Sequence, residues 1–239
     1  MTLHLQTKAL LDLLAMRAEP ALETMTPVEA REMTLRYYIP SDYEIFSRRE
    51  IDAGGVPARL YLPSAEKNLG WCIFFHGGGW RTGHRSQHVM LAKALATKGY
   101  RVFLAEYRLS TEALYPAAML DAQAALIYLH GHSKSLHINP RQIFVAGYSA
   151  GGQMAALLGS VQDENLFGKG QKIKGIIDLD GILAYIHPES GEGDDRVRTS
   201  AATAYFGYAK MENPALWNQA SALHHVSKQD PPVLFINSG

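Results

Sequence analysis

The sequence predicts an α/β fold, with a mostly parallel central sheet that carries helices on both faces. Short apolar runs alternate with segments of helical periodicity: WCIFF at 71–75, RVFLA at 101–105 and IFVA at 143–146 precede helical patterns at 88–99, 116–129 and from 150. Ahead of them, YEIFSRREID and VPARLYLP flank Gly54 and Gly55, which is typical of a hairpin. Because alternating strands and helices form crossover units, this order predicts parallel strands that follow one hairpin.

The later part of the chain extends the same pattern. IKGIIDLDG at 173–181 predicts a further strand, and ESGEGDD at 189–195 predicts a polar insertion. Helical patterns follow at 200–208 and 213–226, and PPVLFINSG at 231–239 predicts another buried strand.

Composition predicts one domain with a buried core, because 47% of the 239 residues are apolar and 19% are charged. Basic and acidic residues both number 23, so nothing points to nucleic acid or an anionic membrane, and a neutral small-molecule ligand is expected. The single cysteine, Cys72, lies in an apolar run and is interpreted as a small buried side chain.

Residues 1–42 are expected to form N-terminal lid helices, at 4–16 and 26–36, over a core domain of 43–239. Thr26 and Glu29 have the spacing of a capping box around Pro27. No segment reaches the roughly 18 to 20 apolar residues of a spanning helix. No cleavage site follows the first helix, so we expect a soluble, cytoplasmic protein.

The string GYSAG at 147–151 lies between the apolar run IFVA and a helical pattern. At a strand-to-helix elbow, small flanking residues let the backbone close so that a serine hydroxyl projects above the sheet. Ser149 is therefore a candidate nucleophile, with Gly147 and Gly151 as the small neighbours. The alternative is a glycine-rich loop with a structural serine, which the flanking strand and helix disfavour.

The string HGGGW at 76–80 follows an earlier apolar strand. Acyl transfer develops negative charge on a carbonyl oxygen, and NH groups of a glycine-rich turn can approach that oxygen unobstructed. We expect Gly78 and Gly79, with the NH of Ala150, to form an oxyanion hole supported by Gly77. His76 is interpreted as a structural residue of this loop, because a general base has to approach Ser149 from the opposite side.

Together, HGGGW, EYRLSTEALYPAAMLDAQAAL and GYSAGG resemble the hormone-sensitive-lipase-like esterases, the HGGG branch of the α/β-hydrolases. The segments DLDGILAYIHPESGEGDD and NPALWNQASALHHV are similar to carbohydrate esterases of gut bacteria. The resemblance implies the α/β-hydrolase fold and a serine esterase. Glu106 stands where that group has Asp in its DYR motif, and Ser110 with Thr111 replaces an AP pair.

A serine esterase also needs a histidine base and an acid that orients it. In this fold they follow the last two core strands, and PPVLFINSG resembles the first of these strands. The last strand, two helices and both partners are therefore expected to be missing from this sequence, which suggests a C-terminal truncation.

Other candidate groups are interpreted as structural. His224, His225, Asp178 and Asp180 do not follow the strands that carry a base or an acid in this fold. His130, His132 and His137 lack metal-ligand spacing, and the acidic run at 189–195 lacks the calcium-loop pattern. We expect no metal and no cofactor.

The leading hypothesis is hydrolysis of short-acyl carboxylic esters through an acyl-enzyme on Ser149. The alternatives are a carbohydrate O-acetyl esterase and a truncated protein with weak or no activity. The expected partner is a small-molecule ester, and an exposed edge strand could form a homo-oligomer.

Overall fold

The computed structural model of the chain describes residues 24–35, 43, 45–63, 69–161, 164–167 and 171–238, with the isolated positions 7, 8, 12, 16 and 20. The expected helix at 4–16 lies almost wholly outside the described residues, so the division at residue 42 stays a prediction. No helix among the described residues is long and apolar enough to cross a membrane.

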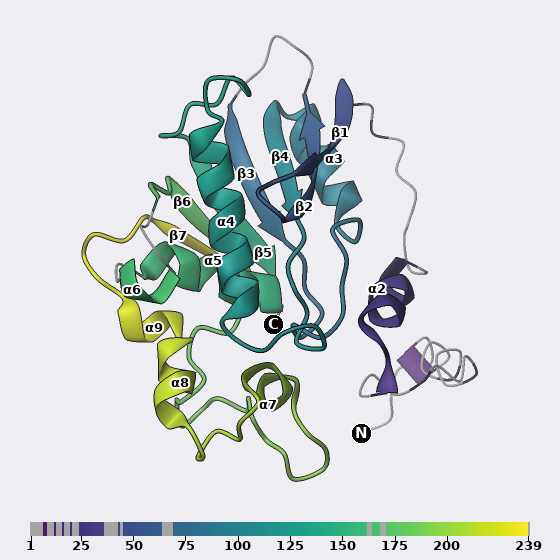
Figure 1. Ribbon diagram of the computed structural model, residues 1–239, viewed down its shortest axis with the longest axis vertical. Coiled ribbons are helices and arrows are strands. Elements are labelled where there is room, and N and C mark those ends of the chain that lie inside the picture. The colour runs from purple at the N-terminus through teal and green to yellow at the C-terminus, as the bar shows by residue number, and fades with distance from the viewer. Residues whose placement is uncertain are drawn as a thin grey trace.

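The described residues form a seven-stranded sheet in the order β1-β2-β4-β3-β5-β6-β7 (Figure 1). β2 pairs antiparallel with both β1 and β4, and the other neighbours are parallel. The predicted hairpin and parallel strands are thereby confirmed. The strands are β1 Ser47–Asp52, β2 Pro57–Leu62, β3 Gly70–Phe75, β4 Tyr100–Ala105, β5 Ile143–Tyr148, β6 Gly175–Leu179 and β7 Val233–Ile236.

Helices cover both faces of the sheet, as the sequence predicts. α3 packs on one face, and α4 and α5 pack on the other (Figure 1). The helices are α2 Pro27–Leu35, α3 Val89–Thr97, α4 Ala117–Gly131, α5 Ala150–Ser160, α6 Glu164–Phe167, α7 Ala201–Phe206, α8 Pro214–Gln219 and α9 Ala222–His225.

The central strand β3 is buried along its whole length. Successive side chains of a strand point to opposite faces, so Cys72 and Phe74 join the core beneath α3 while Ile73 and Phe75 join the core beneath α4 and α5. Burial raises the pKa of the Cys72 thiol to about 12, which confirms that this cysteine is a buried apolar side chain.

The edge strand β7 differs from the sequence prediction. PPVLFINSG was expected to form another buried strand, yet Val233, Leu234, Phe235 and Ile236 are 37%, 54%, 49% and 52% exposed. β7 pairs with β6 on one side, and no other described strand lies beyond it. The prediction of a strand is therefore confirmed, the prediction of its burial is wrong, and the exposed edge strand that the sequence also predicts is found.

The helix α2 begins at the predicted capping box. The Glu29 carboxylate accepts hydrogen bonds from the NH and the hydroxyl of Thr26, both at 2.8 Å. The NH of Glu29 donates to the Thr26 hydroxyl at 3.3 Å, so the two residues cap each other. Ala30 on this helix is fully buried, while Val28 is exposed.

Candidate active site

Ser149 occupies the turn between β5 and α5 and has φ 53° and ψ −116°. A non-glycine residue at positive φ is strained, and such strain concentrates at functional sites. The NH of Ser149 donates to the carbonyl oxygen of Leu179 at 2.7 Å, which ties the turn to the end of β6. The geometry is that of the elbow expected from GYSAG.

The glycines beside Ser149 permit close backbone packing. A Cβ on Gly151 would lie 2.1 Å from the carbonyl oxygen of Phe75, and a Cβ on Gly147 would lie 2.0 Å from the carbonyl oxygen of Gly151. Neither space admits a side chain. The first turn of α5 therefore rests directly against the end of β3.

The HGGGW loop lies beside this elbow, because β3 and β5 are parallel neighbours with Phe75 opposite Gly147. A Cβ on Gly77 would lie 3.4 Å from the Cβ of Ser149. The structure therefore brings together two motifs that are about 70 residues apart in sequence, as the predicted topology requires.

The three NH groups expected in an oxyanion hole belong to Gly78, Gly79 and Ala150. In the described part of the chain, none of them donates to another backbone carbonyl. Gly78 has φ 119° and a Cβ there would lie 2.3 Å from the carbonyl oxygen of Thr82, so only glycine fits this turn. Ala150 is the first residue of α5, whose positive end lies at the elbow.

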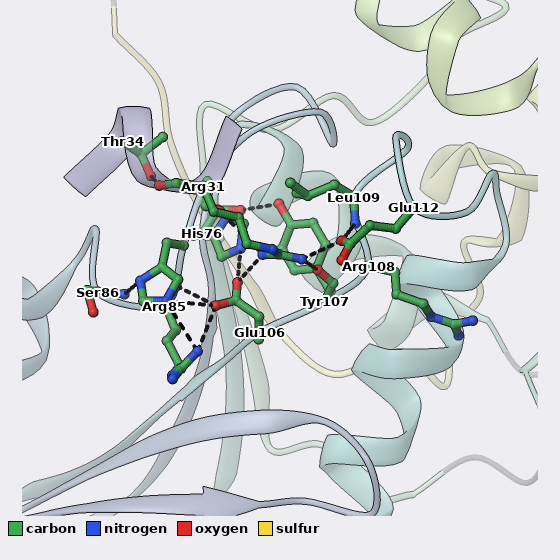
Figure 2. A network of polar contacts seen from close by, with 12 residues as sticks. Arg31, Thr34, His76, Arg85, Ser86, Glu106, Tyr107, Arg108, Leu109 and Glu112 are labelled. Atoms are coloured by element: carbon green, nitrogen blue, oxygen red, sulfur yellow. Dashed lines mark hydrogen bonds and ion pairs between the residues drawn. The ribbon is translucent and has the colours of Figure 1, made fainter. Parts of the chain in front are cut away.

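The buried carboxylate of Glu106 contacts the HGGGW loop at His76 (Figure 2). Its Oε1 lies 2.8 Å from Nε2 of His76 and 2.8 Å from Nη1 of Arg31, and its Oε2 lies 3.1 Å from Nη1 of Arg85. Figure 2 shows these side chains converging on Glu106 from α2, the HGGGW loop and the segment that follows it.

Glu106 is ionised at neutral pH. Burial raises its pKa, but the hydrogen bond from His76 and the charges of His76, Arg31 and His84 together lower the pKa to about 2. A buried negative charge with several cationic partners is stabilised by all of them, so the carboxylate fixes their relative positions.

Both ring nitrogens, the ring face and the carbonyl oxygen of His76 contact neighbouring groups. Nδ1 lies 2.8 Å from the carbonyl oxygen of Gly77, and the ring stacks on Tyr107 with centroids 4.2 Å apart. The Tyr107 hydroxyl donates to the carbonyl oxygen of His76 at 2.8 Å. With Nε2 bound to Glu106, both ring nitrogens are engaged away from Ser149.

Trp80 links the loop to two other segments. Its Nε1 donates to the Gln153 side chain at 3.2 Å, and its ring stacks on Tyr205 of α7 with centroids 4.8 Å apart. Sequence reasoning placed Trp80 in the motif and gave it no partner. It also missed Arg31, although a lone acidic residue after the apolar run RVFLA could have signalled a buried ion pair at Glu106.

The residues considered as substitute acid or base bind groups other than Ser149, although Asp178 lies opposite Gly147 in the sheet. His225 Nε2 lies 2.7 Å from the carbonyl oxygen of Gln219. Burial raises the pKa of Asp178, which accepts from the NH of Gly181, and Asp180 accepts from the NH of Ser238 at 2.6 Å. None of the described histidines or carboxylates hydrogen-bonds the Ser149 side chain.

The acidic run at 189–195 is engaged by neighbouring donors. Asp194 accepts from Nε of Arg196 at 2.8 Å, and Asp195 accepts from the NH of Ser200 at 2.6 Å and from the Thr203 hydroxyl at 2.7 Å. The segment is a polar loop, as the sequence predicts, with Glu189, Asp194 and Asp195 exposed and Glu192 partly buried.

The parallel sheet, the elbow at Ser149 and the adjoining glycine loop define an α/β-hydrolase fold, as the sequence predicted. The chain belongs to the BD-FAE family, which matches residues 59–239. The family match spans the elbow, the HGGGW loop and α7 to α9, and leaves α2 and β1 outside it.

Similar proteins carry ester-hydrolase names. The carboxylic ester hydrolase LipN of Mycobacterium tuberculosis is 37% identical over 108 residues, which cover 44% of this chain and 29% of LipN. A hyperthermophilic esterase from the archaeon Pyrobaculum calidifontis superimposes with a TM-score of 0.76 at 24% identity, over 98% of this chain and 79% of that one. This chain spans between 29% and 39% of the length of the first curated relatives it matches.

A carbohydrate esterase from gut microbiota, described as a truncated form, superimposes with a TM-score of 0.70 at 20% identity. The superposition covers 83% of this chain and 79% of that protein. The resemblance to α/β-hydrolase esterases, including carbohydrate esterases, is therefore confirmed at the level of the fold.

Proposed function

We propose that this protein hydrolyses carboxylic esters with Ser149 as the nucleophile. The observation that supports the proposal best is the juxtaposition of a strained serine elbow with a glycine loop whose NH groups have no described backbone acceptor. Esterases among the similar proteins add support.

In the proposed reaction, the Ser149 hydroxyl attacks the ester carbonyl carbon, and the hydroxyl proton passes to a general base. The NH groups of Gly78, Gly79 and Ala150 bind the oxyanion, and each such donor contributes roughly 10² to 10³ in rate. The base returns this proton to the leaving oxygen as the tetrahedral intermediate collapses, so that the alcohol departs and an acyl-enzyme remains. Water then attacks the acyl carbon and frees Ser149.

His76 and Glu106 are proposed to position the oxyanion loop rather than to move protons. Both ring nitrogens of His76 are bound to acceptors, and Glu106 faces cationic groups on the side of the loop away from the elbow. Gly77, Gly147 and Gly151 are proposed to allow the close packing of loop, strand and helix.

A fluorophosphonate probe tests the nucleophile without requiring full turnover. We expect the probe to label Ser149 in the intact protein, and digestion with mass spectrometry should locate the adduct on the peptide that contains GYSAGG. Labelling that persists in Ser149→Ala, or that never occurs in the folded protein, would contradict the proposal and favour a hydrolase-fold protein without activity.

A carbohydrate O-acetyl esterase is the second candidate. The cavity beside the loop contains the polar side chains of Arg81, Thr199 and Ser200, which could hydrogen-bond a polar substrate. Acetate release from acetylated xylan or pectin, compared with turnover of p-nitrophenyl butyrate, distinguishes this candidate from a short-acyl carboxylesterase. The expected cytoplasmic location is a further proposal, which cell fractionation would test.

We also propose that two copies of this 239-residue chain associate through β7. This strand presents apolar side chains and an outer row of backbone groups with no described partner strand. An exposed apolar edge of this kind is a template for pairing with a second strand.

A further inference from the structure

Gln153 is a fully buried amide side chain in the first turn of α5, directly after the elbow. Its Oε1 accepts from Nε1 of Trp80 at 3.2 Å, and its Nε2 donates to the carbonyl oxygen of Ala220 at 2.9 Å. Its backbone NH donates to the carbonyl oxygen of Ser149 at 3.0 Å. This one residue therefore joins the elbow, the HGGGW loop and the segment between α8 and α9.

The chemistry of the two side-chain partners suits an amide at this position. An indole NH can only donate and a backbone carbonyl oxygen can only accept, so the linking side chain has to accept at one end and donate at the other. The bond to Ala220 thereby fixes the amide so that its oxygen faces Trp80. An apolar side chain here would leave both partners unpaired in a buried place, which is costly.

Trp80 needs an anchor because its backbone is strained. It has φ 57° and directly follows Gly79, which has φ 59°. Positive φ is accessible to glycine but costly for a residue with a large side chain, and it persists only where surrounding contacts fix it. The Trp80 ring stacks on Tyr205, and its carbonyl oxygen accepts from the NH of Ser110 at 2.7 Å. The hydrogen bond to Gln153 ties the same side chain to the helix that begins at the elbow.

The two ends of the HGGGW motif are thus held by different residues. Glu106 binds the side chain of His76 at the first position, and Gln153 binds the side chain of Trp80 at the last. The glycines that carry the proposed oxyanion donors lie between these two anchors. Because peptide groups are planar, the direction of each NH follows from the backbone angles that the anchors fix.

We propose that Gln153 is a positioning residue for ester hydrolysis, and that it acts through Trp80. It keeps the NH groups of Gly78 and Gly79 in place beside Ser149. The inference rests on the proposed function and specifies what sets the geometry of its oxyanion hole.

The rate at which a fluorophosphonate probe labels Ser149 tests the inference, because the phosphoryl oxygen of the probe would accept from the same NH groups as an ester oxyanion. Gln153→Met keeps the length of the side chain and removes the amide. Its labelling should be about 10- to 100-fold slower than in the wild type, as expected when a reactive centre is misplaced by about 1 Å. Ser160→Ala is the control, because it removes a buried hydrogen bond at the other end of α5 and should label at the wild-type rate.

Trp80→Phe tests the link from its other end, since it removes the indole NH and keeps an aromatic ring against Tyr205. It should slow labelling as Gln153→Met does, and the double variant should be about as slow as the slower single variant. Losses that multiply in the double variant, or wild-type rates in either single variant, would overturn the inference. Circular dichroism shows which variants fold, and Trp80→Phe decides the question alone if Gln153→Met does not.

Hydrogen exchange followed by mass spectrometry gives a readout that does not depend on reactivity. The NH groups of Arg81 and Thr82 donate to the carbonyl oxygen of Gly78 at 3.1 and 2.9 Å, so their exchange reports opening of the loop. The peptide spanning residues 76–85 should exchange severalfold faster in Gln153→Met than in the wild type or in Ser160→Ala. Equal exchange would contradict the inference. Failure of the proposed ester hydrolysis would appear separately, as absent labelling of the wild-type protein with the difference in exchange still present.

Discussion

The elbow and the oxyanion loop adjoin each other at the ends of neighbouring strands, yet they are held by different forces. The elbow is fixed by backbone contacts that glycines permit, such as Gly151 against the carbonyl oxygen of Phe75. The loop is fixed by a charged network around Glu106 that reaches as far as α2. The packing at the elbow does not depend on pH, whereas the network around Glu106 does, because it depends on the charge of a carboxylate.

Replacing Ser149 should have the largest effect, because the proposed reaction begins at its hydroxyl. Ser149→Ala should reduce any ester hydrolysis by about 10⁴ to 10⁶, the loss typical of a removed nucleophile. Thermal unfolding followed by circular dichroism should be nearly unchanged, since alanine fits the space. Retention of wild-type turnover by the variant would show that another group attacks the ester.

The packing of the elbow can be broken by one methyl group. Gly151→Ala should lower the free energy of unfolding by about 3 kcal/mol, because the added carbon meets backbone rather than a movable side chain. Gly131→Ala is the matched control, since a Cβ at Gly131 meets nothing within 4 Å. Denaturant unfolding of the two variants should differ, and equal stability would mean that the elbow can relax.

The loop network can be weakened by removing one charge. Glu106→Gln should lower the free energy of unfolding by about 2 kcal/mol at pH 7, because the cations around it lose their shared partner and are themselves partly exposed. Ester turnover should fall as well, while Glu106→Asp, which restores the charge, should recover part of it. Turnover in Glu106→Gln equal to wild type would remove the network from the mechanism.

The same network predicts a dependence of stability on pH. The pKa of Glu106 is lowered to about 2 in the folded protein, against an ordinary value of 4.5. Its stabilising contribution is therefore complete above about pH 5 and is lost as the pH falls toward 2. Acid unfolding of Glu106→Gln should show a shallower fall over this range, and parallel curves for the two proteins would contradict the assignment.

The smallest expected effect concerns self-association at β7. Phe235→Lys or Ile236→Lys should shift sedimentation of the 239-residue chain toward monomer across a concentration series, because a charge on an edge strand opposes pairing. Arg48→Lys on the opposite edge strand β1 conserves charge and serves as the control. A chain that is already monomeric at high concentration would contradict pairing through β7.

The sequence predicted the local structure of this protein, namely its strands, its helices and the elbow at Ser149. Period-two and helical patterns located the strands and helices, because each element buries its own apolar face, and the flanks of Ser149 located the elbow. Glu106 was noticed only as a change from the family motif. Its partner Arg31 lies 75 positions away, and no local pattern reports such a contact.

Sequence reasoning also missed other contacts, because they too join segments that lie far apart in the sequence. The stacking of Trp80 on Tyr205 and the cavity beside Arg198 arise when α7 folds back toward the HGGGW loop. The apolar residues of β7 by themselves indicated burial, whereas the exposed edge was predicted only from the position of this strand in the sheet.

The contact made by Arg31 has a practical consequence for protein engineering. α2 precedes the stretch matched by the BD-FAE family, so a gene shortened to that stretch would begin near residue 59. That deletion would remove the guanidinium that binds Glu106, Glu112 and the carbonyl oxygen of Tyr107. A minimal version of this protein therefore needs its start codon upstream of residue 24, where the capping box and Arg31 are both retained.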